Sequence, residues 1–323
     1  MIKAIKAKEI KVGMYVSLPH AWRAHPFLRN SFTITTNKQI SKIINFGITD
    51  VNIDVEKGIA ATDILRELVQ PEKDFSEKAG IVPEHFREVI ADKKMSPKTK
   101  AKMVHWHSVN MVSKLFDNPD EKSIGQFKEG IVGVVDLILD DNATNHYLMN
   151  LTTHDYNTYV HSVNVGVLAV SLAKTLFPKS GNHDMHALGA GFFLHDLGKV
   201  YIDEAIINKP GKLTDEEMNE MRKHPDLGFK LLNETNQINE ESRLIVLQHH
   251  ERANGMGYPQ KMRGEEIHIY GRICSVADVF DALISKRPYK IKLEPFEALK
   301  IMKEEMMEHF NKDIFEKFVL LFK

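Results

Sequence analysis

Apolar residues recur at helical spacing through most of the chain beyond residue 96. One apolar face runs through the segment that Ser96 and Pro97 open, and a second runs from Ser123 to Asp140. Spacing near 3.6 residues is typical of helices that bury one face. The same pattern predicts helices at Thr158–Thr175, Ala187–Val200, Arg243–His250 and Ile273–Ser285. We expect the faces between residues 96 and 140 to pack in the core or in a dimer interface.

The first 57 residues follow a different pattern. Residues 12–16 and 49–55 alternate apolar and polar side chains, as half-buried strands do, whereas Asn37–Phe46 has helical spacing. This predicts a small mixed α+β module. A compact patch in the module is interpreted as core and turn packing rather than as a ligand surface, and it consists of His20, Trp22, His25, Pro26 and Phe27.

Three segments follow from these patterns, and together they predict an α+β fold class. Residues 1–57 form the small module, and residues 58–144 form a charged connector followed by amphipathic helices. The connector is interrupted by Pro71, Pro83 and Pro97, and proline ends helices because it lacks an N–H donor. Residues 145–323 form an all-α domain, in which Thr214 to Glu217 resembles a capping box that starts a helix.

Net charge bears on which partners the protein can bind, and cysteine content bears on the cellular compartment in which it is expected. The 323 residues carry a formal net charge of -1, which gives no electrostatic reason to expect duplex nucleic acid or an anionic membrane as partner. The single cysteine, Cys274, lies in an apolar run and is expected to be a buried, inert thiol. No apolar run of membrane-spanning length and no secretion leader stands in the sequence. A cytoplasmic protein is therefore expected.

Histidines and carboxylates gather in the helical segment around the stretch LHDLGKV at 194–200. Imidazoles and carboxylates suit divalent cations such as Mn, Fe, Zn or Mg, and side chains from separate helices can enclose two ions. A lone His-Asp pair is more often a structural contact, so the whole constellation carries the prediction. The candidate metal ligands are His161, His195, Asp196, His224, His249, His250 and Asp278.

Asp196 is predicted to bridge two ions. One of its oxygens would serve an ion with His161, His195 and Asp278, and the other would serve an ion with His224, His249 and His250. Hydrolysis of a phosphodiester needs a hydroxide and positive charge beside the developing anion, and two metals about 3.5–4 Å apart supply both. Positions on each ion would remain for water and substrate.

Cations and a glycine-rich loop complete the predicted site. Lys199 stands four residues after His195, so it is expected on the same helix face, within reach of a phosphate; Asp196 and Lys199 are the predicted catalytic residues. In the loop from Asn254 to Gly264, Tyr258 offers a ring to a base or a hydroxyl to a phosphate. Further candidate cations near the substrate are Arg263, Arg287 and Lys290, for each of which a solvated surface role is the alternative.

Three stretches of the sequence resemble the HD-GYP family of bacterial cyclic-dinucleotide phosphodiesterases. They are HDLGK at 195–199, HHERANGMGYP at 249–259 and ADVFDALISKRPYK at 277–290. The resemblance covers roughly residues 145–323 and implies an all-α, HD-type metal-binding domain. The N-terminal module resembles the uncharacterised domain often found before HD-GYP domains. The resemblance rests on GMYV, the patch from Trp22 to Phe27 and VNIDVEKG.

The resemblance also implies roles for individual residues. The seven candidate ligands match the family's metal ligands, the ions are expected to be iron or manganese, and the implied substrate contacts are Lys199, Tyr258, Arg287 and Lys290. Family members with a third metal carry a glutamate where this chain has Asn157, so two ions are expected. Asn254 replaces an aspartate common in the family, which changes loop hydrogen bonding but removes no ligand.

The function that follows is metal-dependent hydrolysis of a cyclic dinucleotide. Cyclic di-GMP is the expected substrate, with 3',3'-cyclic GMP-AMP as the second choice, and the product is the linear dinucleotide or, after a second cleavage, mononucleotide. An alternative is a receptor that binds the dinucleotide and signals to a protein partner through the N-terminal module, with little turnover. A general nucleotide phosphohydrolase is a third reading, which the GYP loop disfavours.

Overall fold

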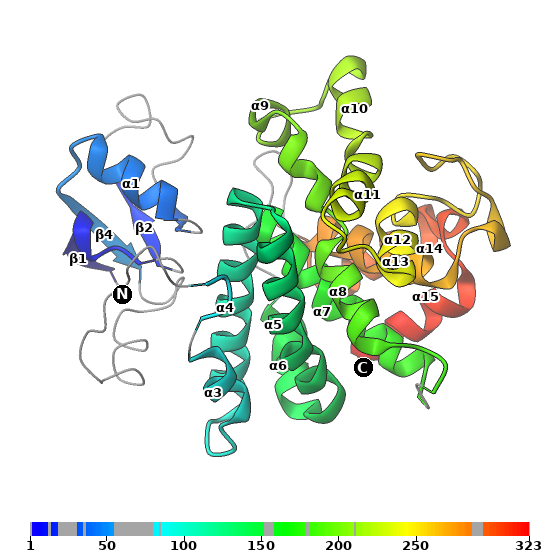
Figure 1. Cartoon of the computed structure of the whole chain (residues 1–323), viewed down its shortest axis with the longest axis horizontal. Coiled ribbons are helices and arrows are strands. Elements are labelled where there is room, and N and C mark those ends of the chain that lie inside the picture. The colour runs from blue at the N-terminus through cyan, green and yellow to red at the C-terminus, as the bar shows by residue number, and fades with distance from the viewer. Residues whose placement is uncertain are drawn as a thin grey trace. The chain divides into compact units, whose positions relative to one another are not determined.

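Two units make up the chain in the computed structural model, Met1–Ala79 and Gly80–Lys323 (Figure 1). The structure describes residues 2–11, 14–18, 31–34, 37–54, 80–83, 85–151, 158–178, 181–209, 211–285 and 293–322. The sequence-based boundaries at residues 57 and 144 stay predictions. The patch from His20 to Phe27 lies outside the described residues.

The first unit is a four-stranded antiparallel sheet with a helix. Its strands are β1 (Ile2–Lys6), β2 (Tyr15–Ser17), β3 (Ser31–Thr33) and β4 (Asp50–Asp54), in the order β1-β4-β2-β3. Helix α1 (Asn37–Asn45) buries Ile43 in a small core with Val16 and Ile53. The predicted α+β module is confirmed. The sequence pattern missed β1 and β3, because both are edge strands whose side chains are mostly exposed or half-buried and therefore show no clear alternation.

The second unit is helical. Its described helices are α3 (Phe86–Ala91), α4 (Pro97–Asp117), α5 (Glu121–Asp140), α6 (Asn142–Leu151), α7 (Thr158–Leu176), α8 (Met185–Leu194), α9 (Glu204–Ile207), α10 (Asp215–Met221), α11 (His224–Glu234), α12 (Glu240–Gln248), α13 (Ile269–Ile284), α14 (Pro295–Glu305) and α15 (Lys312–Val319). Short 3-10 helices cover Leu197–Tyr201, Gly264–Glu266, Met307–His309 and Leu320–Phe322. Among the described residues, no helix is both long and apolar enough to cross a membrane.

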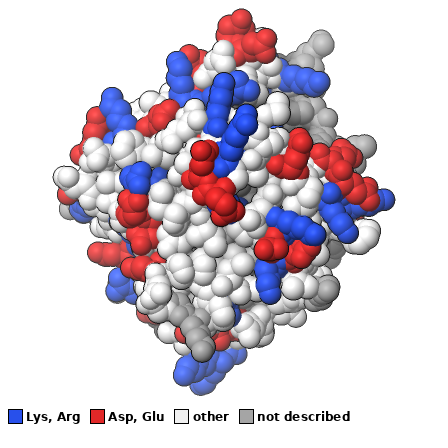
Figure 2. Space-filling model, turned by 90° about the vertical axis from the view of Figure 1, so that its right-hand side faces the viewer, with Lys and Arg blue, Asp and Glu red and all other residues white. Residues whose placement is uncertain are grey.

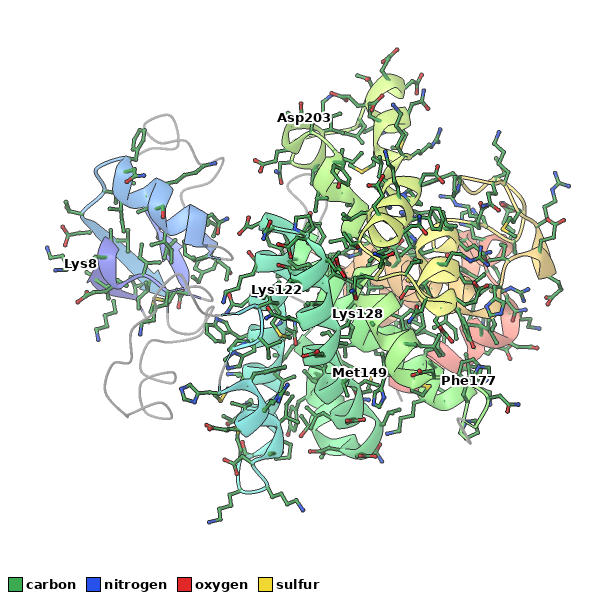
Figure 3. The ribbon with its side chains drawn as sticks, in the orientation of Figure 1. Lys8, Lys122, Lys128, Met149, Phe177 and Asp203 are labelled. Atoms are coloured by element: carbon green, nitrogen blue, oxygen red, sulfur yellow. The ribbon has the colours of Figure 1, made fainter. Side chains whose placement is uncertain are left out.

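Helix α7 is the centre of this unit. All of its residues from His161 to Ala173 are buried, and it packs against α4, α8 and α13. Helices α4, α5 and α6 therefore share one core with the helices that follow them, instead of forming a separate layer. Side-chain bonds reinforce this packing: the Lys128 ammonium on α5 (labelled in Figure 3) donates to the Gln237 carbonyl beyond α11, at 3.0 Å.

Helix starts follow the predicted capping signals. The Ser96 hydroxyl accepts the Thr99 N–H at 3.2 Å, and Pro97 occupies the first turn of α4. Thr214 and Glu217 form the predicted capping box at the start of α10. Helix α12 begins at Glu240, three residues before its predicted start, because the Asn239 side chain caps it.

The prediction of one continuous helix over Ala187–Val200 is wrong. Helix α8 ends at Leu194, and a 3-10 helix begins at Leu197. The reason is a tertiary contact at Gly198: a Cβ there would lie 2.0 Å from the His224 carbonyl oxygen and 2.4 Å from the Gly228 nitrogen. Because the backbones of this turn and α11 touch, the chain must leave the regular helix after α8. His195 and Asp196 consequently lie at a junction, not on a helix face.

Candidate metal centre

One group of side chains joins α7, the end of α8 and α13. The Nε2 atom of His161 lies 3.0 Å from the Asp278 Oδ1 atom and 3.6 Å from the Asp196 Oδ2 atom. His195 Nε2 lies 3.5 Å from the same Asp196 oxygen. One ligand atom from each of His161, His195 and Asp278 lies within 4.8 Å of the others, and all three residues are buried. This group can hold one cation.

A second group lies on the other side of Asp196. The Asp196 Oδ1 atom is 3.2 Å from His224 Nε2 and 3.8 Å from His249 Nε2. His250, whose side chain is 21% exposed, lies 3.4 Å from the Asp278 Oδ2 atom through its Nδ1 atom. Asp196 thus stands between the two groups, with one oxygen facing each.

Backbone carbonyls fix the orientation of three of the imidazoles. The Nδ1–H groups of His195, His224 and His249 donate to the carbonyls of Phe192, Met221 and Val246, at 2.8, 2.8 and 2.9 Å. Each Nε2 atom is therefore left with its lone pair, and each faces Asp196. His224 Nε2 and His249 Nε2 lie 3.1 Å apart, a distance at which two lone pairs repel unless a cation or a proton lies between them.

Two buried polar atoms of the cluster lack a hydrogen-bond partner within the described structure. They are His195 Nε2 and Asp196 Oδ1, each facing the centre of the cluster. Leaving such groups unpaired costs roughly 1–3 kcal/mol each, so they normally have a ligand. The donor set, its burial and its unpaired atoms fit divalent cations.

Burial keeps three imidazoles of the cluster, those of His195, His249 and His250, neutral. It lowers the pKa of His195 and, with the neighbouring imidazole of His250, holds the pKa of His249 well below its usual value. Burial also lowers the pKa of His250 to about 3, although the Asp278 carboxylate acts in the opposite direction. Neutral imidazole is the form that binds metal, so these ligands are ready at neutral pH.

The two carboxylates of the cluster remain ionised. Burial alone would raise the pKa of Asp196, but the Lys199 ammonium and the imidazoles of His195 and His224 hold it well below its usual value. Burial likewise opposes ionisation of Asp278, and the surrounding imidazoles, His161 first and then His250, outweigh it, so that the pKa of Asp278 is also lowered.

Lys199 contacts the cluster from a different element than the one predicted. It lies on the 3-10 helix Leu197–Tyr201, so it does not share a helix face with His195. Its ammonium instead lies 2.5 Å from the Asp196 Oδ2 atom, and its side chain is 11% exposed. The predicted helix geometry is wrong, yet Lys199 is at the site.

The loop after α12 positions Tyr258 beside the second group. The Tyr258 ring lies 4.6 Å from the His250 ring at an interplanar angle of 30°. Glu251, which is buried, accepts the backbone N–H groups of Gln260 at 2.6 Å and Met262 at 3.0 Å. A buried carboxylate thus closes the loop around Tyr258.

Gly257 allows this loop to close tightly. A Cβ at Gly257 would lie 2.4 Å from the Arg252 nitrogen, 2.5 Å from the Glu251 Cα and 2.6 Å from the His250 carbonyl oxygen. The Tyr258 N–H donates to the same carbonyl at 3.2 Å. Backbone atoms leave no room for a side chain at this position.

Three residues that the sequence reasoning did not single out bear on the site. Asp281 accepts the His161 Nδ1–H at 2.7 Å, Glu251 anchors the loop, and the Arg222 guanidinium lies 5.8 Å from the centre of the Tyr258 ring. Asp281 stands three residues after Asp278 on one helix, a spacing that places both on the same side of it and could have indicated Asp281.

The remaining candidates divide into three sets. Asn157, Arg287 and Lys290 lie outside the described residues. Arg263 packs within its own loop, because its Nε atom lies 2.5 Å from where a Cβ on Gly255 would be. Asn254 accepts the Met256 N–H at 3.0 Å and donates to the Glu308 carboxylate at 3.1 Å, so its amide ties the loop to the segment after α14.

A helical fold with an adjoining histidine and aspartate at the centre of an imidazole and carboxylate cluster defines a protein of the HD-domain class. In agreement, residues 149–314 match the family described as HD domain, and residues 2–123 match a domain of unknown function, DUF3391. The chain belongs to the HD-GYP family. The predicted resemblance of both parts is confirmed.

Known relatives support this assignment. The chain is 30% identical to the cyclic di-GMP phosphodiesterase PA4108 of Pseudomonas aeruginosa, over 99% of this chain and 76% of that protein. A 3'3'-cGAMP-specific phosphodiesterase 2 of Vibrio cholerae is 41% identical over 38% of this chain and 24% of that protein. In structure, the chain resembles Bd1817, an HDG"Y"P protein of Bdellovibrio bacteriovorus, with a TM-score of 0.63 at 17% identity over 100% of this chain and 99% of that one. This last likeness concerns the fold.

Proposed function

We propose that this protein is a metal-dependent phosphodiesterase that opens a cyclic dinucleotide. The observation that carries the proposal is the position of Asp196 between two groups of buried ligands. The names of the relatives favour cyclic di-GMP, with 3',3'-cyclic GMP-AMP as the second substrate. The product is the linear dinucleotide, or mononucleotide after a second cleavage.

One ion would be held by His161, His195 and Asp278. A second ion would be held by His224, His249 and His250, and Asp196 would bridge the two. Two divalent ions, iron or manganese, would supply a nucleophile at neutral pH and positive charge for the phosphate. Asn157 has no negative charge with which to hold a third ion, which supports a count of two.

Other residues of the chain would bind and orient the substrate. The Lys199 ammonium offers a charge-assisted hydrogen bond to a phosphate oxygen. Burial raises the pKa of the Tyr258 hydroxyl far above its usual range, and Asp278 and Asp196 raise it further, so this hydroxyl stays protonated. Tyr258 therefore acts as a hydrogen-bond donor to phosphate and as a ring surface for a base, not as a general base.

Surface charge supports a small ligand bound at this local site. Figure 2 shows acidic and basic side chains interspersed on the face of the second unit that carries the loop after α12. A mixed surface gives no continuous positive field for a long polyanion. The cations at the site, Lys199 and Arg222, would instead meet the two phosphates of a cyclic dinucleotide.

Chromatography of the reaction products tests the proposal. Protein loaded anaerobically with Mn(II) or Fe(II) is expected to convert cyclic di-GMP to linear product, and competition with 3',3'-cyclic GMP-AMP ranks the substrates. Tight nucleotide binding that survives chelation, without hydrolysis by fully metallated protein, would instead identify a receptor and overturn the enzyme proposal.

Elemental analysis tests the metal arrangement. Native protein is expected to hold close to two ions per chain, and Asp196→Ala should lose metal and activity together. Asp136→Ala is the control, because Asp136 is an exposed carboxylate that pairs only with His186 among the described residues. Asn157→Glu is expected to raise the ion count, whereas three ions in the native protein would contradict the reading.

A further inference from the structure

A chain of hydrogen bonds leads from helix α4 to the cluster. His105 on α4 bonds through its Nε2 atom to the Asn164 Oδ1 atom at 3.0 Å. Asn164 donates its Nδ2–H to the Asp281 Oδ1 atom at 2.8 Å, and Asp281 accepts the His161 Nδ1–H at 2.7 Å. We infer that His105 is a positioning residue for His161, acting through Asn164 and Asp281.

The first link decides the orientation of an amide. An asparagine side chain can present either its oxygen or its NH2 group in a given direction. A donor at His105 Nε2 requires the Asn164 oxygen to face it, and the NH2 group must then face Asp281. With the amide reversed, its oxygen would lie against a carboxylate oxygen and repel it. An N–H donor at His105 and the accepting carboxylate of Asp281 therefore favour the same orientation of the amide, and His105 adds to the hold on it.

The second link holds the carboxylate in place. Asp281 is fully buried, and the Asn164 amide occupies its Oδ1 atom. Its Oδ2 atom accepts both the Ser285 hydroxyl, at 3.1 Å, and the His161 Nδ1–H. A buried carboxylate requires such donors, and their geometry fixes the plane in which it meets His161.

The third link sets the tautomer of His161. Because its Nδ1 atom carries the hydrogen that Asp281 accepts, its Nε2 atom keeps a lone pair. That lone pair faces Asp278 at 3.0 Å and Asp196 at 3.6 Å, where a cation would be held. Outer partners of this kind orient a ligand and raise its basicity.

Helix α4 lies outside the segment that matches the HD domain. That match covers residues 149–314, whereas α4 lies within the segment 2–123 that matches the domain of unknown function. The centre thus depends on a residue that precedes the HD domain in the chain. The inference rests on the proposed metal role of His161 but not on the identity of the substrate.

Metal affinity of the full chain measures the effect. For His105→Leu we expect the dissociation constant for Mn(II), from chelator competition, to rise roughly 3- to 10-fold, below the 10- to 100-fold typical of a direct outer partner. His105→Gln restores an N–H donor of similar reach and should recover most of the affinity. His107→Leu is the matched control, because His107 lies on the same helix, is buried and bonds to none of these residues.

Nitrogen NMR of the metal-free protein provides a readout that a general loss of stability would not move. His161 is expected to carry its hydrogen on Nδ1 in the wild type and in His107→Leu, and to become a mixture of tautomers in His105→Leu. If His105→Leu does not fold, Asn164→Ala removes the donor to Asp281 from the other side and should give the same mixture.

Unchanged Mn(II) affinity and an unchanged His161 tautomer in folded His105→Leu would overturn the inference. That result leaves the phosphodiesterase proposal intact if the wild type hydrolyses cyclic dinucleotide. Conversely, a wild type without hydrolysis, whose Mn(II) affinity still depends on His105, would reject the enzyme proposal and support the positioning role.

Discussion

Arg222 is a cation near the cluster whose role in substrate binding can be tested by mutation. Its guanidinium lies 5.8 Å from the centre of the Tyr258 ring, and no carboxylate pairs with it within the described part of the chain. A guanidinium that is held by a ring and not neutralised remains available for a phosphate or a guanine edge.

We therefore expect Arg222→Gln to raise KM about tenfold. This factor corresponds to the loss of one charge-assisted hydrogen bond of about 1.5 kcal/mol. The value of kcat and the metal content should change little. Lys223→Gln is the control in steady-state kinetics, since Lys223 is exposed and already paired with Glu220. An equal rise in KM for both variants would mean that only overall charge matters.

His107 is expected to make stability depend on pH. Burial lowers its pKa to about 4, with a smaller contribution from His85, and its Nδ1 atom has no partner among the described residues. In the unfolded chain its pKa is near 6.5, so below that pH the unfolded state binds the extra proton. Its contribution is complete above pH 6.5 and declines as the pH falls to about 4.

Urea unfolding of the metal-free protein at a series of pH values measures this decline. Between pH 6.5 and 4 the free energy of unfolding of the wild type should fall by up to about 3 kcal/mol more than that of His107→Leu. Parallel curves for the two proteins would show that His107 is not the group responsible.

Residue types with restricted chemistry were the most predictable. The seven candidate ligands stand out in the sequence because few side chains bind divalent cations, and the structure brings all seven together. Asp281 did not stand out, because a carboxylate that acts through a histidine looks like any other helical carboxylate until the histidine is placed beside it. The sequence pattern alone also gave no reason to connect His105 with His161.

Helices were predictable where a local cause determines them. Apolar spacing and the caps at Ser96 and Thr214 located α4, α5, α7 and α10 closely. The break after α8 was not predictable, because it depends on contact between Gly198 and a helix that comes later in the chain. Tertiary contacts of this kind override local spacing.

The conformation of the loop after α12 can be tested by a substitution at Gly257. Gly257→Ala would bring a methyl group within 2.6 Å of three backbone atoms, so the loop must move and carry Tyr258 away from His250. We expect a loss of activity of at least tenfold, with metal content retained, measured by kinetics and elemental analysis.

Gly125→Ala is the control for this variant. A Cβ at Gly125 meets only the end of the Gln237 side chain, at 3.8 Å, and the position is helical, so alanine should be neutral or slightly stabilising. Full activity in Gly257→Ala would show that the position of Tyr258 does not matter for turnover.

At the scale of the whole molecule, all seven candidate ligands belong to one unit. The unit begins at Gly80, well before the HD-domain match at residue 149, and α4, α5 and α6 contribute to its core. Removal of residues 1–79 should therefore leave metal binding intact. Removal of residues 1–148 strips those helices from α7 and α8 and should yield aggregated or unfolded protein.

Size-exclusion chromatography and calorimetric metal titration of the two truncated chains check this expectation. A shorter chain, 149–323, that folds and binds metal like the full protein would contradict it, and would also count against any role for His105. Loss of metal binding in the chain 80–323 would show that the N-terminal unit takes part in the centre.

The contact between Gly198 and Gly228 links the family motif HDLGK to a residue thirty positions away. Neither glycine has a functional group, yet their close approach lets His224 reach Asp196 at 3.2 Å. A side chain at position 198 cannot be accommodated by a change at position 228, because a Cβ at position 198 would lie 2.0 Å from the backbone oxygen of His224 and 2.4 Å from the backbone nitrogen of Gly228. The glycine of the motif is thus required by the close approach of two backbones, and it serves the site only by letting its neighbours meet.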